Sequence, residues 1–473
     1  MRHFHFKLFL LLSLWLTGCT FGPDYQTPFI HVPHDFKEGP GWKLAEPKAH
    51  LPRGDWWKIF GDPVLDCLQE RVTLNNQNLK MAEARYRQAQ ARAEMAGAVL
   101  YPTLSGNLGM ARGQTSNAKA PVTTRTLGLN VSWELDLWGR VQRGTEAEIA
   151  TAQAEMSDLE AARLSLHAQM AQNYFLLRVA EQQSKLYSET LTAYEQFLTL
   201  TRHQHDAGLV TSSDVAQAEN QLFNTKAQAL DIELQRRQLE HVLAQLVGRT
   251  PADFDLAPAL LPENPPEIPS VLPAEMLERR PDVAVAERRV AVANAQIGVA
   301  EAAFFPTLSL GLAGGYQGTI HSGWFDSPAR FWSLGPTLAA TLFDGGLRQA
   351  EQQQALAVYD QAVAFYRQTV LNAMQEVEDT LATVRLLDGE IVAQNGAVKA
   401  ARQAQALTEN QYQAGMVSHL ALITTQAAAL ASERAALSLR GRRYTAVVTL
   451  IKALGGDWHK MEKKESQRQN PGG

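Results

Sequence analysis

The chain has 473 residues with a formal net charge of −5, and charged residues make up only 20% of it. This balance indicates neither a basic surface nor an acidic tail, so no nucleic-acid partner is expected. Two cysteines are too few for a disulfide framework. Apart from a short stretch at the very start, no apolar run approaches the length of a membrane-spanning helix.

The N-terminus carries the pattern of an export signal. Basic residues precede an apolar run at Leu8–Leu16, and the sequence Leu16–Cys19 follows it. This order resembles the bacterial lipobox, in which small residues admit the signal peptidase and the cysteine is acylated, palmitate included. Residues 1–18 are therefore a predicted lipoprotein signal peptide and Cys19 a predicted lipidation site, and Thr20 instead of Asp favours export to the outer membrane. A secreted soluble protein with a chance cysteine is the alternative.

Residues 19–63 are predicted to be an extended N-terminal segment, because scattered prolines and one aromatic cluster cannot form a core alone. A helical pattern then runs from Val64 to Leu100. If Cys19 is acylated, Cys67 in this helix is the remaining thiol, and it is expected to pack as a small apolar side chain.

Strict two-residue alternation next predicts a β-hairpin at about residues 103–137. Its strands, 103–112 and 126–137, flank a polar loop at 113–124. The odd positions of the second strand are all apolar: Leu127, Leu129, Val131, Trp133, Leu135 and Leu137. Each strand has about the length of 9–11 residues that crosses a bilayer at a tilt.

From Thr145 to Ala207 the sequence contains no glycine or proline and fits a heptad pattern. At about 1.5 Å per residue such a helix is on the order of 100 Å long, more than a compact globular fold accommodates. The chain is expected to reverse near Gly208, where glycine supplies the left-handed position, and to return as a helix at Ser212–Leu246. A fibrous coiled coil with an incidental strand is the alternative, but the whole pattern occurs twice.

The second half of the chain repeats the first. The segments follow in this order: residues 64–248 as the first repeat, 249–273 as a Pro-rich linker, 274–456 as the second repeat and 457–473 as a C-terminal tail. The second repeat is predicted to contain a β-hairpin at about 307–343 and a helical hairpin with its tip near Gly415. The landmarks match in order: Tyr101–Ser105 with Phe305–Ser309, Asp136 and Arg140 with Asp344 and Arg348, and Ala207–Val210 with Ala414–Val417.

Four predicted strands per chain cannot close a barrel, and open strand edges are not tolerated in lipid, so the chain is expected to oligomerise. Two copies would give eight strands, and three would give twelve and leave an aqueous lumen. Aromatic residues gather near the strand ends, as in the girdles of membrane barrels: Tyr101, Trp133, Trp138, Phe304, Phe305, Phe331, Trp332 and Phe343. Two amphipathic hairpins packed on a soluble core are the alternative.

Several motifs together resemble the outer-membrane factor (TolC-like) family, and specifically its NodT-like lipoprotein branch. Besides the lipobox, the paired Pro-Thr-Leu strand starts and the two Ala-Gly turns, they are Trp57–Leu65, Leu135–Arg140, Arg279–Glu287 and Phe343–Gly346. The resemblance covers essentially the whole mature chain. Its specificity lies in the order and repetition of the motifs.

The resemblance implies an α+β membrane protein: a homotrimeric, 12-stranded transmembrane β-barrel in the outer membrane, continued by a periplasmic α-helical barrel. It implies the exit duct of a tripartite efflux pump for drugs or other toxic compounds, which works with a periplasmic adaptor and an inner-membrane transporter, usually of the resistance-nodulation-division type. Neither an enzyme nor a cofactor is expected. A duct for type I protein secretion and a non-conducting structural trimer remain alternatives.

In the family the duct narrows at the periplasmic helix tips. The matching candidates for the aperture here are Leu420 and Thr424, and Asp206 and Asp214 near the tip of the first hairpin are candidates to supply charge instead. Because relatives often have Asp at the place of Thr424, closure is expected to depend more on the packing of Leu420 than on charge. The candidates for contact with the adaptor are Gly208, Leu209, Gly415 and Met416. No metal site is expected from His203 and His205, because residues two apart do not share a helix face.

Overall fold

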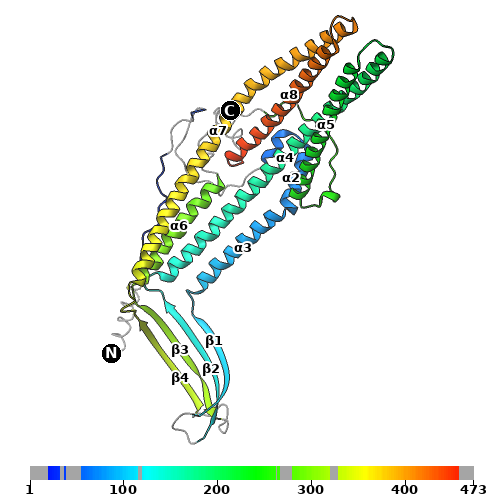
Figure 1. Ribbon diagram of the computed structural model, residues 1–473. Helices are drawn as coiled ribbons and strands as arrows, with labels where there is room; N and C mark the ends of the chain where they lie inside the picture. The colour runs from blue at the N-terminus through cyan, green and yellow to red at the C-terminus, as the bar shows by residue number, and fades with distance from the viewer. Residues whose placement is uncertain are drawn as a thin grey trace, which may run out of the picture. The chain divides into compact units, whose positions relative to one another are not determined.

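The computed structural model describes residues 20–31, 37–38, 55–114, 120–262, 264–266, 280–319 and 329–456 (Figure 1). The predicted signal peptide, Cys19 and the tail at 457–473 lie outside the described residues. The chain forms two compact units, which are described separately. The first combines residues from 1–30, 83–158 and 282–369, and the second combines residues from 31–82, 159–281 and 370–473.

A four-stranded antiparallel sheet dominates the first unit. Its strands lie side by side in the order β1-β2-β3-β4 (Figure 1). Their bounds are Thr103–Gly113 for β1, Val122–Leu135 for β2, Thr307–Thr319 for β3 and Arg330–Ala339 for β4. Strand β2 begins inside the stretch expected to be a polar loop, because Val122, Thr123 and Thr124 continue the ladder opposite Gly113, Arg112 and Ala111.

Two long helical hairpins run through the chain. Helix α4 (Arg140–Asp206) is followed by α5 (Ser212–Leu246), and α7 (Leu347–Gln413) by α8 (His419–Ala453) (Figure 1). The two 67-residue helices are followed two residues later by Gly208 and Gly415, whose φ angles of 73° and 71° give the left-handed backbone that reverses the chain. None of the described helices combines the length and apolarity needed to cross a membrane.

The helical pattern predicted at Val64–Leu100 is divided into α2 (Pro63–Asn75) and α3 (Gln77–Ala98). Asn76 between them has an extended backbone. Its side-chain Nδ2 donates to the Leu246 carbonyl at 2.8 Å, and its Oδ1 accepts from the Leu79 amide at 3.1 Å. A buried asparagine with two side-chain hydrogen bonds therefore marks the break in the helix and attaches it to the end of α5. Cys67 in α2 is exposed, so the expectation that it is packed is wrong.

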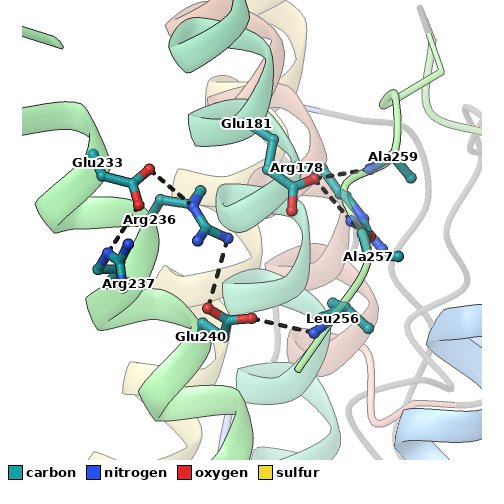
Figure 2. A network of polar contacts seen from close by, with 9 residues as sticks. All are labelled: Arg178, Glu181, Glu233, Arg236, Arg237, Glu240, Leu256, Ala257 and Ala259. Carbon is teal, nitrogen blue, oxygen red and sulfur yellow. Dashed lines mark hydrogen bonds and ion pairs between the residues drawn. The ribbon is translucent and has the colours of Figure 1, made fainter. Parts of the chain in front are cut away.

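The remaining helices are short or belong to the second repeat: η1 at Trp56–Phe60, η2 at Pro251–Asp253 and α6 at Pro281–Ala302. After η2, residues 254–262 of the Pro-rich linker lie along α4 and α5 in the second unit. Arg178 donates to the Ala257 carbonyl at 2.8 Å, Glu181 accepts from the Ala259 amide at 3.1 Å, and Glu240 accepts from the Leu256 amide at 3.2 Å (Figure 2). Side chains of both helices thus satisfy backbone groups that a linker without secondary structure cannot pair itself.

Candidate functional site

One face of the sheet is apolar across all four strands. The register brings Leu104, Val131, Leu312 and Leu334 into one row, because each is opposite the next along the ladder. Leu104 is 67% exposed and Leu334 is 61% exposed in the single chain, and Trp332 beside Leu334 is 75% exposed. A soluble surface rarely carries so large a continuous apolar patch. This face needs an apolar environment that the chain itself does not supply.

The opposite face of the sheet is small and polar. Its residues form rows in the same register: Ser105, Asn130, Ala313 and Ser333 in one, and Thr103, Ser132, Gly311 and Gly335 in the next. Asn130 donates to Asn107 Oδ1 at 3.3 Å across β1 and β2. Such groups are compatible with water, so the two faces are suited to two different solvents.

The sheet is incomplete within one chain. Among the described residues, strands β1 and β4 each pair on one side only. In an apolar environment every unpaired backbone N–H and C=O costs several kcal/mol, and only a closed barrel removes both edges. Edge pairing with further copies is therefore what this arrangement requires in a membrane.

An aromatic cluster lies where the hairpins meet the N-terminal segment. The Phe21 and Phe305 rings stack with centroids 4.2 Å apart, and Trp138 stacks on Phe305 at 5.0 Å. Trp138 Nε1 donates to the Pro306 carbonyl at 2.7 Å. Trp138 and Phe305 belong to the aromatic set expected near the strand ends, and Phe21 is an addition that the sequence did not indicate.

Arg143 of α4 holds the N-terminal segment in the first unit. Its side chain is only 7% exposed, and it donates to the carbonyls of Phe21 and Gly22 and to Asp24 at 3.1–3.2 Å. Hydrogen bonds to Asp24 and to Glu146 raise the pKa of Arg143 although its burial acts in the opposite direction. A Cβ at Gly298 would lie 2.8 Å from the Phe21 carbonyl oxygen, so only glycine permits this close approach. The chain directly after Cys19 is thereby fixed at the base of the hairpins.

The α4–α5 tip presents an apolar residue beside charged ones. Leu209 is 74% exposed, and the Asp206 side chain is 81% exposed. Asp214 belongs to the capping box of α5, where it accepts from the Thr211 amide at 2.9 Å and from the Thr211 hydroxyl at 2.7 Å. These bonds lower the pKa of Asp214, so it carries a charge at neutral pH.

The α7–α8 tip is more apolar. Met416 is 72% exposed and Leu420 is 58% exposed, while Thr424 donates its hydroxyl to the Leu420 carbonyl of its own helix at 2.8 Å. The Leu420 side chain is thus more than half exposed in the described part of one chain, and a gate at this position would need other copies. Among the described residues no group of three or more His, Cys, Asp or Glu side chains is placed to hold a metal ion.

His419 connects the two tips, and the sequence interpretation gave it no role. It is the first residue of α8 and is only 4% exposed. Its ring stacks on Phe197 of α4 with centroids 4.7 Å apart, and Tyr412 of α7 lies 6.0 Å away. His419, Leu422 and Ala429 are all buried. Their helical spacing places His419 on the same face of α8 as the apolar residues, and this spacing was the signal in the sequence that could have identified it.

The comparisons with known proteins agree with this geometry. The family model of outer membrane efflux proteins matches residues 68–249 and 272–456. The chain belongs to the outer membrane efflux protein family. This membership confirms the resemblance drawn from the motifs, and it assigns the chain to outer membrane components of efflux systems rather than to fibrous or soluble proteins.

Individual members of the outer membrane efflux protein family are similar over nearly the whole chain. The pyoverdine export protein OpmQ of Pseudomonas aeruginosa is 34% identical over 423 residues, which cover 85% of this chain and 87% of OpmQ. The probable efflux pump protein TtgC of Pseudomonas putida is 30% identical, with 97% and 98% covered. The solved outer-membrane channel OprN superposes with a TM-score of 0.84 at 31% identity, covering 93% of this chain and 100% of OprN.

Proposed function

We propose that three copies of the chain form a 12-stranded barrel in the outer membrane, lipid-anchored at Cys19, that serves as the passive, gated exit duct of an efflux pump. The observation that carries this proposal is the register of the sheet, which places apolar rows on one face and small polar rows on the other across four strands with two open edges. Three copies bring twelve strands, enough for a water-filled lumen lined by the polar rows.

The helices supply the periplasmic part of the proposed duct. Exposed apolar residues recur along α5 at Phe223, Leu230 and Leu234, which share one helix face. Such a stripe is suited to packing against a helix of a neighbouring copy, so three copies would surround the duct with an α-helical barrel. The tips at Gly208–Leu209 and Gly415–Met416 would then face the periplasmic adaptor.

The contacts that Arg143 and Gly298 make with residues 21–24 support the proposed lipid anchor. Acyl chains on Cys19 would enter the membrane beside Phe21, Trp138 and Phe305, and such aromatic rings favour the boundary between lipid and water. The anchor would then hold the mature N-terminus at the level of the strand ends.

The selection of cargo and the energy for its transport would come from other components. Related proteins are named for pyoverdine export, toluene efflux and cation efflux, three cargoes with little chemistry in common. A small, polar lining fits this range because it offers no specific recognition. We therefore infer export of small molecules, driven by an inner-membrane transporter of the resistance-nodulation-division type through the adaptor, with no catalytic step in this chain.

The test is native mass together with planar-bilayer conductance of the acylated protein. We expect a trimer with small, mostly closed conductance. A monomer, or a trimer that never conducts even after Leu420→Ala, would overturn the proposal and favour a structural role. Cys19→Ser tests the anchor separately, since the trimer should still form while the mass of the acyl chains is lost.

A further inference from the structure

His419 is a buried base located between two helical hairpins. α4 contributes Phe197 to its surroundings, α7 contributes Tyr412, and α5 contributes Asp214. A core of Tyr194, Leu198, Ala218 and Leu222 lies between α4 and α5 in the same region. The α7–α8 hairpin therefore contacts Phe197 of the α4–α5 hairpin through the ring of His419 and also through Tyr412, whose centroid lies 5.9 Å from that of Phe197.

Neither ring nitrogen of His419 has a hydrogen-bond partner among the described residues, and both are shielded from solvent. A neutral imidazole leaves one N–H donor and one acceptor unpaired here, which is the smaller penalty, and its ring stacks as an aromatic ring does. An imidazolium incurs the larger penalty, because it carries two N–H donors and a full charge that have lost their water. The start of α8 adds to the penalty, since the positive end of the helix dipole lies next to the ring.

The charged and titratable groups around the ring do not offset this penalty. Phe197 carries no charge. The Tyr412 phenol is neutral at physiological pH, and burial raises its pKa further. Asp214 is the carboxylate that favours the imidazolium, but burial outweighs it and lowers the pKa of His419. The Asp214 carboxylate also accepts hydrogen bonds from the Thr211 amide and hydroxyl in the capping box.

We propose that His419 is a proton-sensitive latch: the neutral ring holds the α7–α8 tip against α4, and its protonation releases the tip. The further step, in which release of the tip opens the duct, rests on the proposed function. The latch itself concerns only the packing within one chain.

The direction of the pH dependence follows from the linkage between proton binding and packing of the ring. The ring binds a proton more readily when released than when packed, so the latch is at full strength above the ordinary pKa of 6.5 and weakens as the pH falls through that value. At about pH 5.5 a released ring with the ordinary pKa is about 90% protonated, so the equilibrium shifts toward release by at most about tenfold.

Hydrogen–deuterium exchange of the whole protein in detergent tests the latch. Peptides covering 211–224 and 416–426 are compared between wild type and His419→Phe at about pH 7.5 and about pH 5.5. His419→Phe preserves the stack but cannot be protonated. Comparing the two proteins at one pH cancels the intrinsic pH dependence of exchange. His205→Phe is the matched control, because His205 is an exposed histidine at the neighbouring tip.

We expect equal protection at the higher pH and up to about tenfold faster exchange of wild type at the lower pH, with His205→Phe behaving as wild type. Asp214→Asn should leave the onset of the response at the pKa of the released ring and extend the response to lower pH, because the packed ring then binds a proton less readily. Equal exchange of wild type and His419→Phe at both pH values overturns the latch. The peptide covering 307–319 shows whether each variant is folded. If the exchange experiment contradicts the latch but the trimer conducts, the proposed duct still stands. If the trimer never conducts, the proposed duct fails, but the exchange result still tests the latch.

Discussion

Arg178 and Glu181 form an ion pair of 2.8 Å that is almost fully shielded from water, with side chains 2% and 5% exposed. Each partner also binds the backbone of the linker, at Ala257 and Ala259 (Figure 2). One pair of charges thus connects two turns of α4 to a segment about 80 residues further along the chain.

Arg178→Met should destabilise the second unit by about 3–5 kcal/mol, because it leaves the Glu181 carboxylate buried without the cation that neutralises it. The double variant with Glu181→Leu should recover part of the loss. Arg237→Met is the control: Arg237 pairs with Glu233 but is 63% exposed, and its loss should change stability by less than about 1 kcal/mol. Thermal unfolding of the three variants measures the difference, and equal effects of Arg178→Met and Arg237→Met would contradict it.

Adjacent residues of β4 should respond in opposite ways to the same charge. Leu334 lies in the apolar row and Ser333 in the polar row. Leu334→Arg should reduce the yield of assembled protein in the outer membrane, at a cost of about 2–4 kcal/mol for a charge facing lipid. Ser333→Arg should assemble normally and alter the ion selectivity of the conductance. Equal yields of the two variants in membrane fractions would show that the sheet does not face lipid on its apolar side.

His167 should make the second unit sensitive to acid. Burial lowers the pKa of His167 to about 4, and its Nδ1 lies 2.5 Å from Gln69 Oε1. The packed ring therefore contributes fully above the ordinary pKa of 6.5, and this contribution is lost as the pH falls. At about pH 4.5 the loss is about 2.5 kcal/mol.

The check is the thermal midpoint as a function of pH for wild type and His167→Gln. The wild-type midpoint should fall more steeply between about pH 6.5 and about pH 4.5, since glutamine does not titrate. Parallel curves would mean that the imidazole is not responsible for the acid sensitivity.

Leu420→Ala should increase the conductance or open probability of the trimer. The side chain is 58% exposed in one chain, so truncating it removes little packing within the protomer and acts at the proposed aperture between copies. Met416→Ala, at the turn itself, should leave intrinsic conductance unchanged and weaken binding to the adaptor. Single-channel recordings compare the two, and unchanged conductance of Leu420→Ala would remove Leu420 from the gate.

The sequence alone determined the parts of this protein that repeat with a fixed period. Alternation at Leu127–Leu135 identified a two-faced strand, and the absence of glycine and proline between Thr145 and Ala207 identified the long helix, since both patterns follow from local backbone geometry. The repeat and the motif order indicated the family. The helix break at Asn76 escaped notice because its cause, a hydrogen bond to Leu246, lies 170 residues away.

The tertiary structure decided those features that depend on contacts between separate helices and strands. The rows that make one face apolar exist only once four strands are in register, and the register was not encoded in any one strand. His419 was an ordinary polar residue at the start of a helix until folding placed Phe197, more than 200 residues earlier, against its ring. Local patterns fix which elements form. Burial and contacts between distant residues fix which side chains acquire chemistry.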